Sequence, residues 1–349
     1  RLNVPKRSYL SFGTTPLSGV LERGEEIKFS ISIQIQPDGK KEEIFSQTLD
    51  WKDLPGWRNN RVGLSSYGGK KVEISFKVES KDKTFAFWGN PQILVEREEE
   101  QLNVILISID TLRADHLSSY GYKLNTSPHM DAIAQQGVLF KSAISQSPWT
   151  YPSHAAMFTS LYPSALGFKM IPNVLSSEYI ILPNGARTIP EILRRHGYLT
   201  GAFVGGFPIG VQNGFAQGFS FYNQKWPEDI EVVYNQLTEW IHEHQRDKFF
   251  LFFHTFEVHQ YHPGEHEIFA HRIDPSEKLK RTIALYDGKI RLVDGYIGLL
   301  VEYLKKLRLA EKTLVIITSD HGEGFYEHGY EKHGYGLYDE LLKVPLIFY

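Results

Sequence analysis

Hydrophobic and polar residues alternate in the first part of the chain. In residues 26–36, EIKFSISIQIQ, an isoleucine or phenylalanine occupies every second position. A period of two indicates a strand with one buried face. Residues 71–80 repeat the pattern, and residues 84–95 predict a further pair of strands. Sequences that favour turns separate these segments, so we expect residues 1–98 to form an all-β sandwich domain.

The pattern changes after the charged linker EREEEQ at 96–101. Residues 102–110, LNVILISID, form a continuous apolar run that ends in an aspartate, as expected of a parallel strand buried on both faces. Apolar strands then alternate with helical segments, which indicates an α/β sheet with helices on both faces. We therefore expect residues 99–349 to form one α/β domain. Its further strands are predicted at 197–206, 248–256 and 312–320, and its helices at 127–137, 188–197 and 287–306.

Composition narrows the possible functions. The net charge is −3, without the basic excess typical of nucleic-acid binding, so we expect no nucleic-acid partner. The chain has no cysteine, which excludes disulfides and thiol catalysis. No apolar run approaches the roughly 18 residues that a membrane span needs. Because the chain begins with Arg1 and stops within a strand, we expect a longer natural protein, with the C-terminal end of the α/β domain missing.

Acidic and histidine side chains follow several of the predicted strands. Asp110 ends the first α/β strand, and the pair Asp320-His321 ends another. Because the carboxyl ends of parallel strands meet at one edge of a sheet, we expect these side chains to share one site. Two carboxylates and an imidazole suit Zn²⁺, Mn²⁺ or Ca²⁺. For each aspartate taken alone, the alternative is a helix cap or a turn residue.

A threonine lies just before a predicted helix, in the stretch PWTYPSHAAM. Thr150 precedes Pro152, which suits the first turn of a helix. Thr150 would then lie at the positive end of that helix, where backbone N–H groups attract an anion. A hydroxyl bound to a metal loses its proton more readily and can attack phosphorus or sulfur. The alternative is that Thr150 merely caps the helix.

Four segments together resemble the sulfatase family, within the alkaline phosphatase superfamily. They are NVILISIDTLRADHLSSYGY at 103–122, TSPHMDAIAQQGVLF at 126–140, SPWTYPSHAAMFTSLYP at 147–163, and the segment 319–347, which begins SDHGEGFYEHG. The similarity covers essentially all of residues 102–349, with the motifs in the expected order. It implies a mixed, mainly parallel sheet flanked by helices, and a divalent metal at the active site.

The resemblance also implies roles for individual residues. Asp110, Asp320 and His321 match metal ligands of the family. Thr150 matches the nucleophile of the family's Cys/Ser-x-Pro-x-Arg motif, which also binds the metal. We favour one metal, although a second site of the alkaline phosphatase type is an alternative. The residues available for that second site are His254, Glu257, His259, His328 and His333.

Two histidines resemble family residues that handle the substrate. His259 matches a histidine that contacts the substrate or the leaving group. His333 lies where many members carry a lysine or histidine that binds the anion, although the neighbouring Lys332 is an alternative for that role. Both histidines are therefore expected to stabilise the oxyanion or to protonate the leaving oxygen.

Three departures separate this chain from ordinary sulfatases. Thr150 is neither Cys nor Ser, and formylglycine is made only from those two residues, so this chain cannot carry it. His154 replaces the arginine that supports formylglycine. Thr111 replaces a second aspartate, and His321 stands where many sulfatases have asparagine. These differences resemble the relatives that transfer phosphoryl groups.

The sequence thus predicts a metal-dependent hydrolase or transferase that acts on phosphate esters through Thr150. The substrate would be an anionic ester, on a glycan or a lipid, and the protein would be exported from the cytoplasm. One alternative is a sulfuric ester hydrolase that works without formylglycine. The other is a non-catalytic surface protein, because residues 1–98 resemble carbohydrate-binding jelly rolls. Trp51, Trp57 and Trp88 of that region are expected in its core rather than on a sugar-stacking face.

Overall fold

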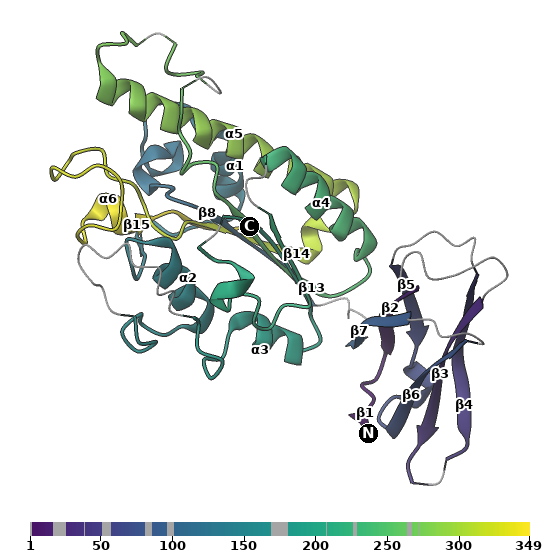
Figure 1. Ribbon diagram of the computed structural model, residues 1–349. Helices are drawn as coiled ribbons and strands as arrows, with labels where there is room; N and C mark the ends of the chain where they lie inside the picture. Colours follow the sequence, from purple (N-terminus) through teal and green to yellow (C-terminus); the bar gives the residue numbers. More distant parts are fainter. Residues whose placement is uncertain are drawn as a thin grey trace. The chain divides into compact units, whose positions relative to one another are not determined.

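The computed structural model describes residues 2–16, 26–37, 39–50, 57–80, 86–95, 101–168, 181–206, 208–225, 229–263, 267–271 and 273–349. The chain divides into two compact units (Figure 1). The first unit holds residues 1–99 together with 246–248, and the second holds residues 100–245 and 249–349.

The first unit consists of two antiparallel sheets whose facing side chains share one core. Alternating residues of the two sheets, such as Phe12 and Ile31, are buried in that core, as the period of two predicts. A short 3₁₀ helix, η1 (Ser65–Tyr67), lies between two strands. The four-stranded sheet has the order β1 (Leu2–Asn3), β6 (Lys71–Ser80), β3 (Glu26–Ile35), β4 (Lys41–Asp50); the three-stranded sheet has the order β5 (Arg58–Gly63), β2 (Ser8–Pro16), β7 (Ala86–Val95).

The strand pair predicted at 84–95 is wrong, because β7 is one continuous strand. The sequence Gly89-Asn90-Pro91 suggested a turn. The pairing of β7 with β2 instead shifts register there, and Asn90 adopts a φ of 41°. A β-bulge accommodates a proline and a left-handed residue without ending the strand.

The tryptophans of the first unit differ in environment. Trp88 contacts Phe12, Phe29 and Phe45 in the core, as predicted. Trp57 is 58% exposed, so the prediction of a core position is wrong for it. Its ring lies over Gly89, where an added Cβ would come within 2.5 Å of the ring. Trp51 lies outside the described residues.

A short segment from the middle of the chain completes the first unit. Asp247 is buried, and its carboxylate accepts two hydrogen bonds from Arg61, at 3.0 and 2.7 Å. The hydroxyl of Tyr9 donates to the same carboxylate. A buried carboxylate with three donors is well compensated for its loss of water.

The second unit is built on a seven-stranded mixed sheet. The five strands from β12 to β14 are parallel, and β16 and β9 are antiparallel to their neighbours. The predicted apolar runs form the central strands, and β8, β11 and β13 are almost entirely buried. The order is β12 (Phe221–Lys225), β11 (Leu199–Gly205), β13 (Phe249–Thr255), β8 (Asn103–Ile109), β14 (Thr313–Thr318), β16 (Leu346–Phe348), β9 (Val138–Leu139).

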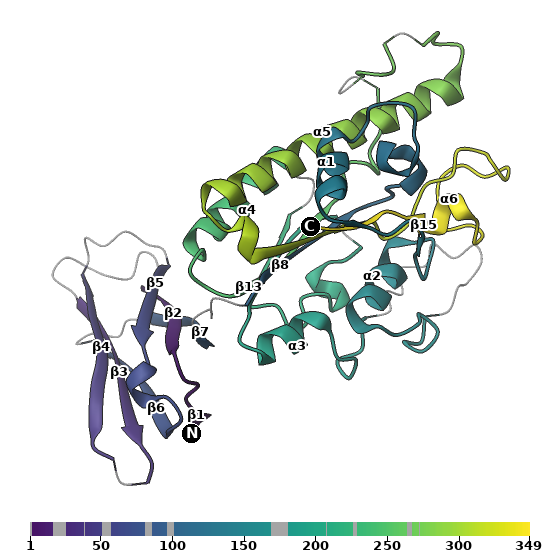
Figure 2. The ribbon, with the colours of Figure 1, turned by 180° about the vertical axis from the view of Figure 1, so that it is seen from behind.

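Helices cover both faces of this sheet. Figures 1 and 2 show α1, α4 and α5 on one face, with α2 and α3 on the other. The helices are α1 (Pro128–Gln136), α2 (Thr150–Thr159), α3 (Ile189–Arg195), α4 (Ile230–Glu243), α5 (Lys278–Lys306) and the short α6 (Asp339–Leu342). The remaining elements are the 3₁₀ turns η2 (Ala114–His116), η3 (Ser118–Tyr120), η4 (Val211–Asn213) and η5 (Ala310–Lys312), and the pair β10 (Ala143–Ile144) and β15 (Lys343–Val344).

Local signals account for the helix boundaries. Thr188 forms the predicted N-cap of α3, in a capping box with Glu191. Gly137 ends α1 as predicted, and an added Cβ there would meet the carbonyl oxygen of Phe348. Helix α5 begins nine residues before the predicted start, at Lys278 rather than at Asp287. The predicted fold class, a mixed and mainly parallel sheet between helices, is confirmed. Within the described parts of the chain, no helix is long and apolar enough to cross a membrane.

Candidate active site

Three neighbouring strands carry the candidate site residues at their carboxyl ends. Asp110 follows β8, the pair Asp320-His321 follows β14, and His254 is the last residue but one of β13. Both β13 and β14 pair directly with β8, so all four side chains emerge at the same edge of the sheet. All four are fully buried.

Helix α2 brings Thr150 to the same point. Thr150 is the first residue of the helix, and the N-cap residue that precedes it is Trp149. Its Oγ1 atom lies 3.1 Å from Nε2 of His321 and 3.5 Å from Oδ2 of Asp110. From the sequence alone, the hydroxyl of Thr150 could belong to a helix cap or to a nucleophile. In the structure it faces Asp110 and His321 at the strand ends. Only 2% of Thr150 is exposed.

The imidazole of His321 is oriented by the backbone of the next residue, Gly322. Its Nδ1 lies 2.8 Å from the carbonyl oxygen of Gly322, which can only accept a hydrogen bond. Nδ1 therefore carries the proton, and Nε2 presents a lone pair to the site. Nε2 lies 3.4 Å from Oδ2 of Asp320 and 3.8 Å from Oδ1 of Asp110. This is the arrangement of a histidine that ligates a cation.

The backbone after Asp110 is strained in a way that orients Asp320. Thr111 has a φ of 61°, which is rare for a β-branched residue. In this conformation its N–H donates to Oδ1 of Asp320 at 3.3 Å, and its carbonyl oxygen accepts from the hydroxyl of Tyr286 at 2.8 Å. The N–H of His321 donates to the same Oδ1 at 2.9 Å. Oδ2 of Asp320 is thereby turned toward Nδ1 of His154 and Nε2 of His321, at 3.5 and 3.4 Å.

The site has the features expected of a cation-binding centre. Oδ1 of Asp110 and Oδ2 of Asp320 are buried and have no hydrogen-bond partner among the described residues. Burial and the charge of Asp320 raise the pKa of Asp110 well above its usual range. Burial disfavours a charge on both carboxylates, and a positive charge between them would favour the ionised form of each. Asp110, Asp320 and His321 are close enough together to hold one metal ion, and the residues therefore fit a divalent metal.

Two further histidines lie behind these ligands. His154, on α2, contacts Ser108 Oγ through Nε2 and the carbonyl oxygen of Thr150 through Nδ1, both at 2.9 Å. Nε2 of His254 lies 3.4 Å from Oδ2 of Asp110. Burial lowers the pKa of each histidine to about 4, so both imidazoles are neutral at pH 7. With Asp320 they form a second group that has the spacing of metal ligands.

His333 lies next to His321, and His259 lies next to His333. The ring of His333 is 4.4 Å from that of His321 and 5.1 Å from that of His259. Nδ1 of His333 donates to Oε1 of Glu323 at 3.0 Å. Burial lowers the pKa of His333, but the bond to Glu323 and its charge outweigh this and raise it. Burial and the charge of His333 instead lower the pKa of His259 to about 4.

Glu323 was missed in the sequence, although it follows Asp320 by only three residues in the motif SDHGE. It is 1% exposed, and its second oxygen accepts from the hydroxyl of Tyr261 at 3.1 Å. Of the residues considered for a second metal, Glu257 binds Lys289 at 2.9 Å and His328 binds Glu340 at 2.6 Å. Both are therefore engaged elsewhere. Lys332 is exposed, and its backbone pairs with Gly324.

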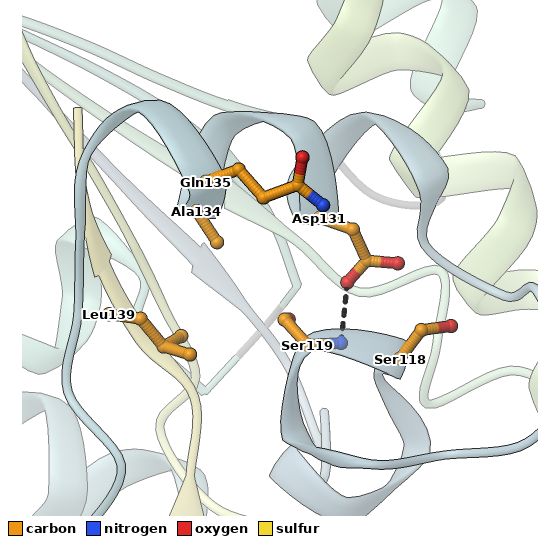
Figure 3. A pocket seen from close by; sticks show the side chains of 6 residues that line it. All are labelled: Ser118, Ser119, Asp131, Ala134, Gln135 and Leu139. Atoms are coloured by element: carbon orange, nitrogen blue, oxygen red, sulfur yellow. Dashed lines mark hydrogen bonds between the residues drawn. The ribbon is translucent and has the colours of Figure 1, made fainter.

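A cavity of about 310 Å³ lies elsewhere in the second unit, between η3, α1 and β9 (Figure 3). In it, the N–H of Ser119 donates to Asp131 at 2.8 Å. None of the catalytic or metal-ligand candidates lines this cavity. Its lining residues are Ser118, Ser119, Asp131, Ala134, Gln135 and Leu139.

Comparison with known proteins identifies the family. The sulfatase family model matches residues 102–349, which is most of the chain. The chain belongs to the sulfatase family. Among curated sulfatases, the dog N-acetylgalactosamine-6-sulfatase is 23% identical over 272 residues, which cover 63% of this chain and 50% of that enzyme. Human arylsulfatase A is 36% identical over 110 residues, which cover 31% of this chain and 21% of that enzyme. The chain thus spans about half the length of the first of these relatives.

Solved structures share the fold of the second unit. The C-terminal periplasmic domain of phosphoethanolamine transferase EptC from Campylobacter jejuni superposes with a TM-score of 0.56 at 20% identity, covering 71% of this chain and 79% of that domain. Phosphonate monoester hydrolase of Agrobacterium radiobacter superposes with a TM-score of 0.57 at 20% identity, covering 71% and 68%. At this identity the likeness establishes the architecture only.

Proposed function

We propose that this sulfatase-family protein is a metal-dependent phosphoester hydrolase or phosphotransferase, with Thr150 as its nucleophile. The observation that carries the proposal is the position of the Thr150 hydroxyl, 3.1 Å from His321 and 3.5 Å from Asp110, on the first residue of a helix. The N-cap of α2 is Trp149, so Thr150 does not occupy the cap position that the sequence left as an alternative. The helix N-terminus adds partial positive charge where an anionic ester would bind.

Asp110, Asp320, His321 and Thr150 would hold the metal. When bound, the metal polarises the phosphoryl oxygens and lowers the pKa of the threonine hydroxyl. Imidazole nitrogen together with carboxylate oxygen suits Zn²⁺ or Mn²⁺ better than Ca²⁺, which prefers a shell of six to eight oxygens. We favour one metal, because both ring nitrogens of His154 already lie 2.9 Å from Ser108 and from the Thr150 carbonyl.

Residues of this chain then carry out the separate steps of the reaction. The Thr150 hydroxyl loses its proton to solvent, its oxygen bonds to phosphorus, and the bond from phosphorus to the leaving oxygen breaks. His333, whose pKa is raised, gives its proton to that oxygen. Neutral His259 donates a hydrogen bond to the ester. Water, or an acceptor alcohol, then attacks the phosphothreonine and frees Thr150, and its proton returns to His333.

The test is hydrolysis of three p-nitrophenyl esters by the metal-loaded protein: the phosphate monoester, the phosphate diester and the sulfate. We expect cleavage of a phosphate ester that is lost in Thr150→Ala while the metal content is retained. Cleavage that survives in Thr150→Ala would overturn the assignment of the nucleophile. A lack of activity on all three esters, together with a lack of bound metal, would favour a non-catalytic binding protein.

A sulfuric ester hydrolase is the second candidate. Curated relatives of this chain are named as sulfatases, and sulfate and phosphate esters carry similar oxyanions. Cleavage of the sulfate ester alone would establish this candidate, with an unmodified threonine as nucleophile. Mass spectrometry of the peptide that contains Thr150 would show whether the residue is unmodified.

We also propose that the protein acts outside the cytoplasm. A solved structure with the same fold is titled a periplasmic domain, which supports an extracytoplasmic site of action. The two antiparallel sheets of the first unit support a role for residues 1–98 as an accessory, jelly-roll-like binding domain. Fractionation of cells that express the complete gene would test the location, and a glycan array probed with the chain would test the accessory role.

A further inference from the structure

A buried tyrosine hydroxyl spans the turn that follows β8. Tyr286 lies on α5 and is fully buried. Its hydroxyl donates to the carbonyl oxygen of Thr111 at 2.8 Å and accepts from the N–H of Arg113 at 2.9 Å. One oxygen atom therefore holds both ends of the segment from Thr111 to Arg113, which begins directly after Asp110.

This segment contains the strained residue of the site. A β-branched residue with a φ of 61°, as Thr111 has, costs free energy and persists only where its surroundings hold it. In this conformation the N–H of Thr111 donates to Oδ1 of Asp320 at 3.3 Å, while the carbonyl oxygen accepts from Tyr286. The hydroxyl of Tyr286 thus supplies a bond that favours the strained conformation over a relaxed one.

The ring of Tyr286 is itself fixed by three other rings. Those of His116, Phe325 and Tyr261 pack against it edge-on, with centroids 5.0, 5.0 and 5.7 Å away. They come from three different segments, namely η2 and the segments that follow β14 and β13. A phenylalanine in place of Tyr286 would keep these packing contacts and lose only the hydroxyl.

We propose that Tyr286 is a positioning residue for the metal site, because its hydroxyl holds the turn that places the carboxylates of Asp110 and Asp320. Relaxation of Thr111 would displace Asp110, which directly precedes it, and would withdraw the N–H that orients Asp320. Oδ1 of Asp320 also accepts from the N–H of His321 at 2.9 Å, so loss of the hydroxyl should weaken the site without abolishing it. This inference rests on the proposed function, because it takes a metal to lie between the two carboxylates.

The test measures the affinity of the chelator-treated protein for Zn²⁺, by competition with a chromophoric chelator. We expect Tyr286→Phe to raise the Kd for Zn²⁺ about ten- to a hundredfold, as is typical when a group that orients a metal ligand is lost. The variant Asp110→Asn measures Zn²⁺ that binds outside the site. Excess Zn²⁺ should restore most of kcat in Tyr286→Phe, because the buried hydroxyl acts through the metal ligands and does not touch the ester.

Tyr120→Phe is the matched control. The hydroxyl of Tyr120 likewise donates to a backbone carbonyl, that of Phe140, and accepts a backbone N–H, that of Leu346, both at 2.9 Å. Neither partner is a candidate site residue. Tyr120→Phe should therefore lower the melting temperature, as Tyr286→Phe does, and leave the Kd for Zn²⁺ unchanged.

The variant Thr111→Gly tests whether the hydroxyl acts through the strained turn. Glycine adopts a positive φ without strain, so the turn then depends less on Tyr286. In the Thr111→Gly protein, adding Tyr286→Phe should raise the Kd less than about threefold, a coupling that a tyrosine important only for stability would not show. A rise of about a hundredfold in that background would contradict the proposal, even if Tyr286→Phe alone does not fold.

A folded Tyr286→Phe protein that binds Zn²⁺ with the native Kd would overturn the positioning role and leave the proposed function in place. A native protein that neither binds Zn²⁺ through Asp110 nor cleaves any ester would instead fail the proposed function. Amide hydrogen exchange of the chelator-treated protein would then still test Tyr286, since Tyr286→Phe should speed exchange at Thr111 and His321. Unchanged exchange at these two amides would also overturn the positioning role.

Discussion

The hydroxyl of Thr150 and Nε2 of His321 lie 3.1 Å apart, although the two residues are 171 positions apart in the chain. Thr150 begins α2 and His321 follows strand β14. The sheet and α2 must therefore pack against each other before the two atoms can be close. Nδ1 of His321 is committed to the Gly322 carbonyl, which leaves Nε2 free to accept or to ligate. The candidate site is thus a product of the whole second unit.

Substitutions of Thr150 should distinguish the effect of its hydroxyl on the rate from the effect of its side-chain shape. Thr150→Val keeps the branched side chain but has no nucleophilic oxygen, and we expect it to lower kcat by at least about a thousandfold. Thr150→Ser keeps the oxygen and should stay within roughly tenfold of the native rate, because small shifts in position still cost rate. The matched control is Ser153→Ala, a hydroxyl on the same helix that donates to the Asp320 carbonyl at 2.6 Å. Steady-state kinetics on the p-nitrophenyl ester that is cleaved would decide.

Metal content should depend on Asp110 and Asp320, each of which has one oxygen without a hydrogen-bond partner in the described parts of the chain. We expect the purified protein to hold one divalent metal per chain, and Asp110→Asn or Asp320→Asn to lose it. Chelation should lower the melting temperature, since a ligand at a hundred times its Kd stabilises the folded state by about 2.7 kcal/mol. Elemental analysis and thermal unfolding would measure both effects.

The variant His254→Gln distinguishes one metal from two. It should keep the single metal that Asp110, Asp320 and His321 hold. A content of two metals per chain that falls to one in His254→Gln would contradict the single-metal proposal. That result would assign the second ion to His154, His254 and Asp320, which also have the spacing of metal ligands.

Stability without metal should fall in mild acid because of buried neutral histidine. Burial lowers the pKa of His154 from 6.5 to about 4 in the folded protein. Below pH 6.5 the unfolded chain therefore binds a proton that the folded chain does not. The contribution of neutral His154 to the free energy of unfolding is therefore present in full above pH 6.5. It falls by about 3 kcal/mol as the pH is lowered to 4.

Urea unfolding of chelator-treated protein between pH 4 and 7 would measure this dependence. His154→Gln should flatten it. The exposed His196 offers the control, and His196→Gln should leave the slope as it is in the native chain. An identical slope in His154→Gln would show that this histidine does not account for the acid sensitivity.

Arg113 should act on the rate through the segment that carries His333. It is 5% exposed and binds Asp115 with two hydrogen bonds, the carbonyl of Glu323 at 3.0 Å and Glu327 at 2.5 Å. Lysine cannot make this forked set of bonds. We expect Arg113→Lys to lower kcat roughly ten- to a hundredfold by misplacing Glu323 and His333, with the metal content unchanged.

The control for Arg113 is an arginine whose bond lies at the surface. Arg291→Lys alters only an exposed contact with the Asn125 carbonyl at 3.2 Å, and it should keep the native rate. If Arg113→Lys lowers the melting temperature but leaves kcat at the native value, Arg113 is a stability residue and has no part in placing His333.

The strand-end positions could be predicted from the sequence because they follow from topology. A run such as LNVILISID shows that a strand is buried on both faces, and parallel strands bring their carboxyl ends to one edge. Asp110, Asp320 and His321 could therefore be grouped before any coordinates. Pro152 marked Thr150 as the start of a helix, and only the resemblance to the sulfatase family implied that Thr150 lies beside these residues.

Partners set by packing could not be predicted in this way. The contacts of His154 with Ser108 and of His333 with Glu323 depend on how α2 and the segment after β14 lie on the sheet. Local sequence also misled at Gly89-Asn90-Pro91, where a turn signal proved to be a bulge. The burial of single aromatic residues could not be predicted for the same reason. Trp57, for example, is exposed and lies over Gly13 and Gly89 on the outside of a sheet.

The position of Asp247 in the sequence affects where the first unit can be separated from the rest of the chain. The first unit takes its buried carboxylate from a tripeptide that lies about 150 residues beyond its last strand, and Arg61 and Tyr9 bind that carboxylate. A gene fragment that ends at residue 99 would encode each strand of the unit that the structure describes and would still lack Asp247, which Arg61 and Tyr9 bind. Residues 1–99 and the folded unit are therefore not identical, so we expect the unit to be more stable in another protein when residues 246–248 are supplied with it.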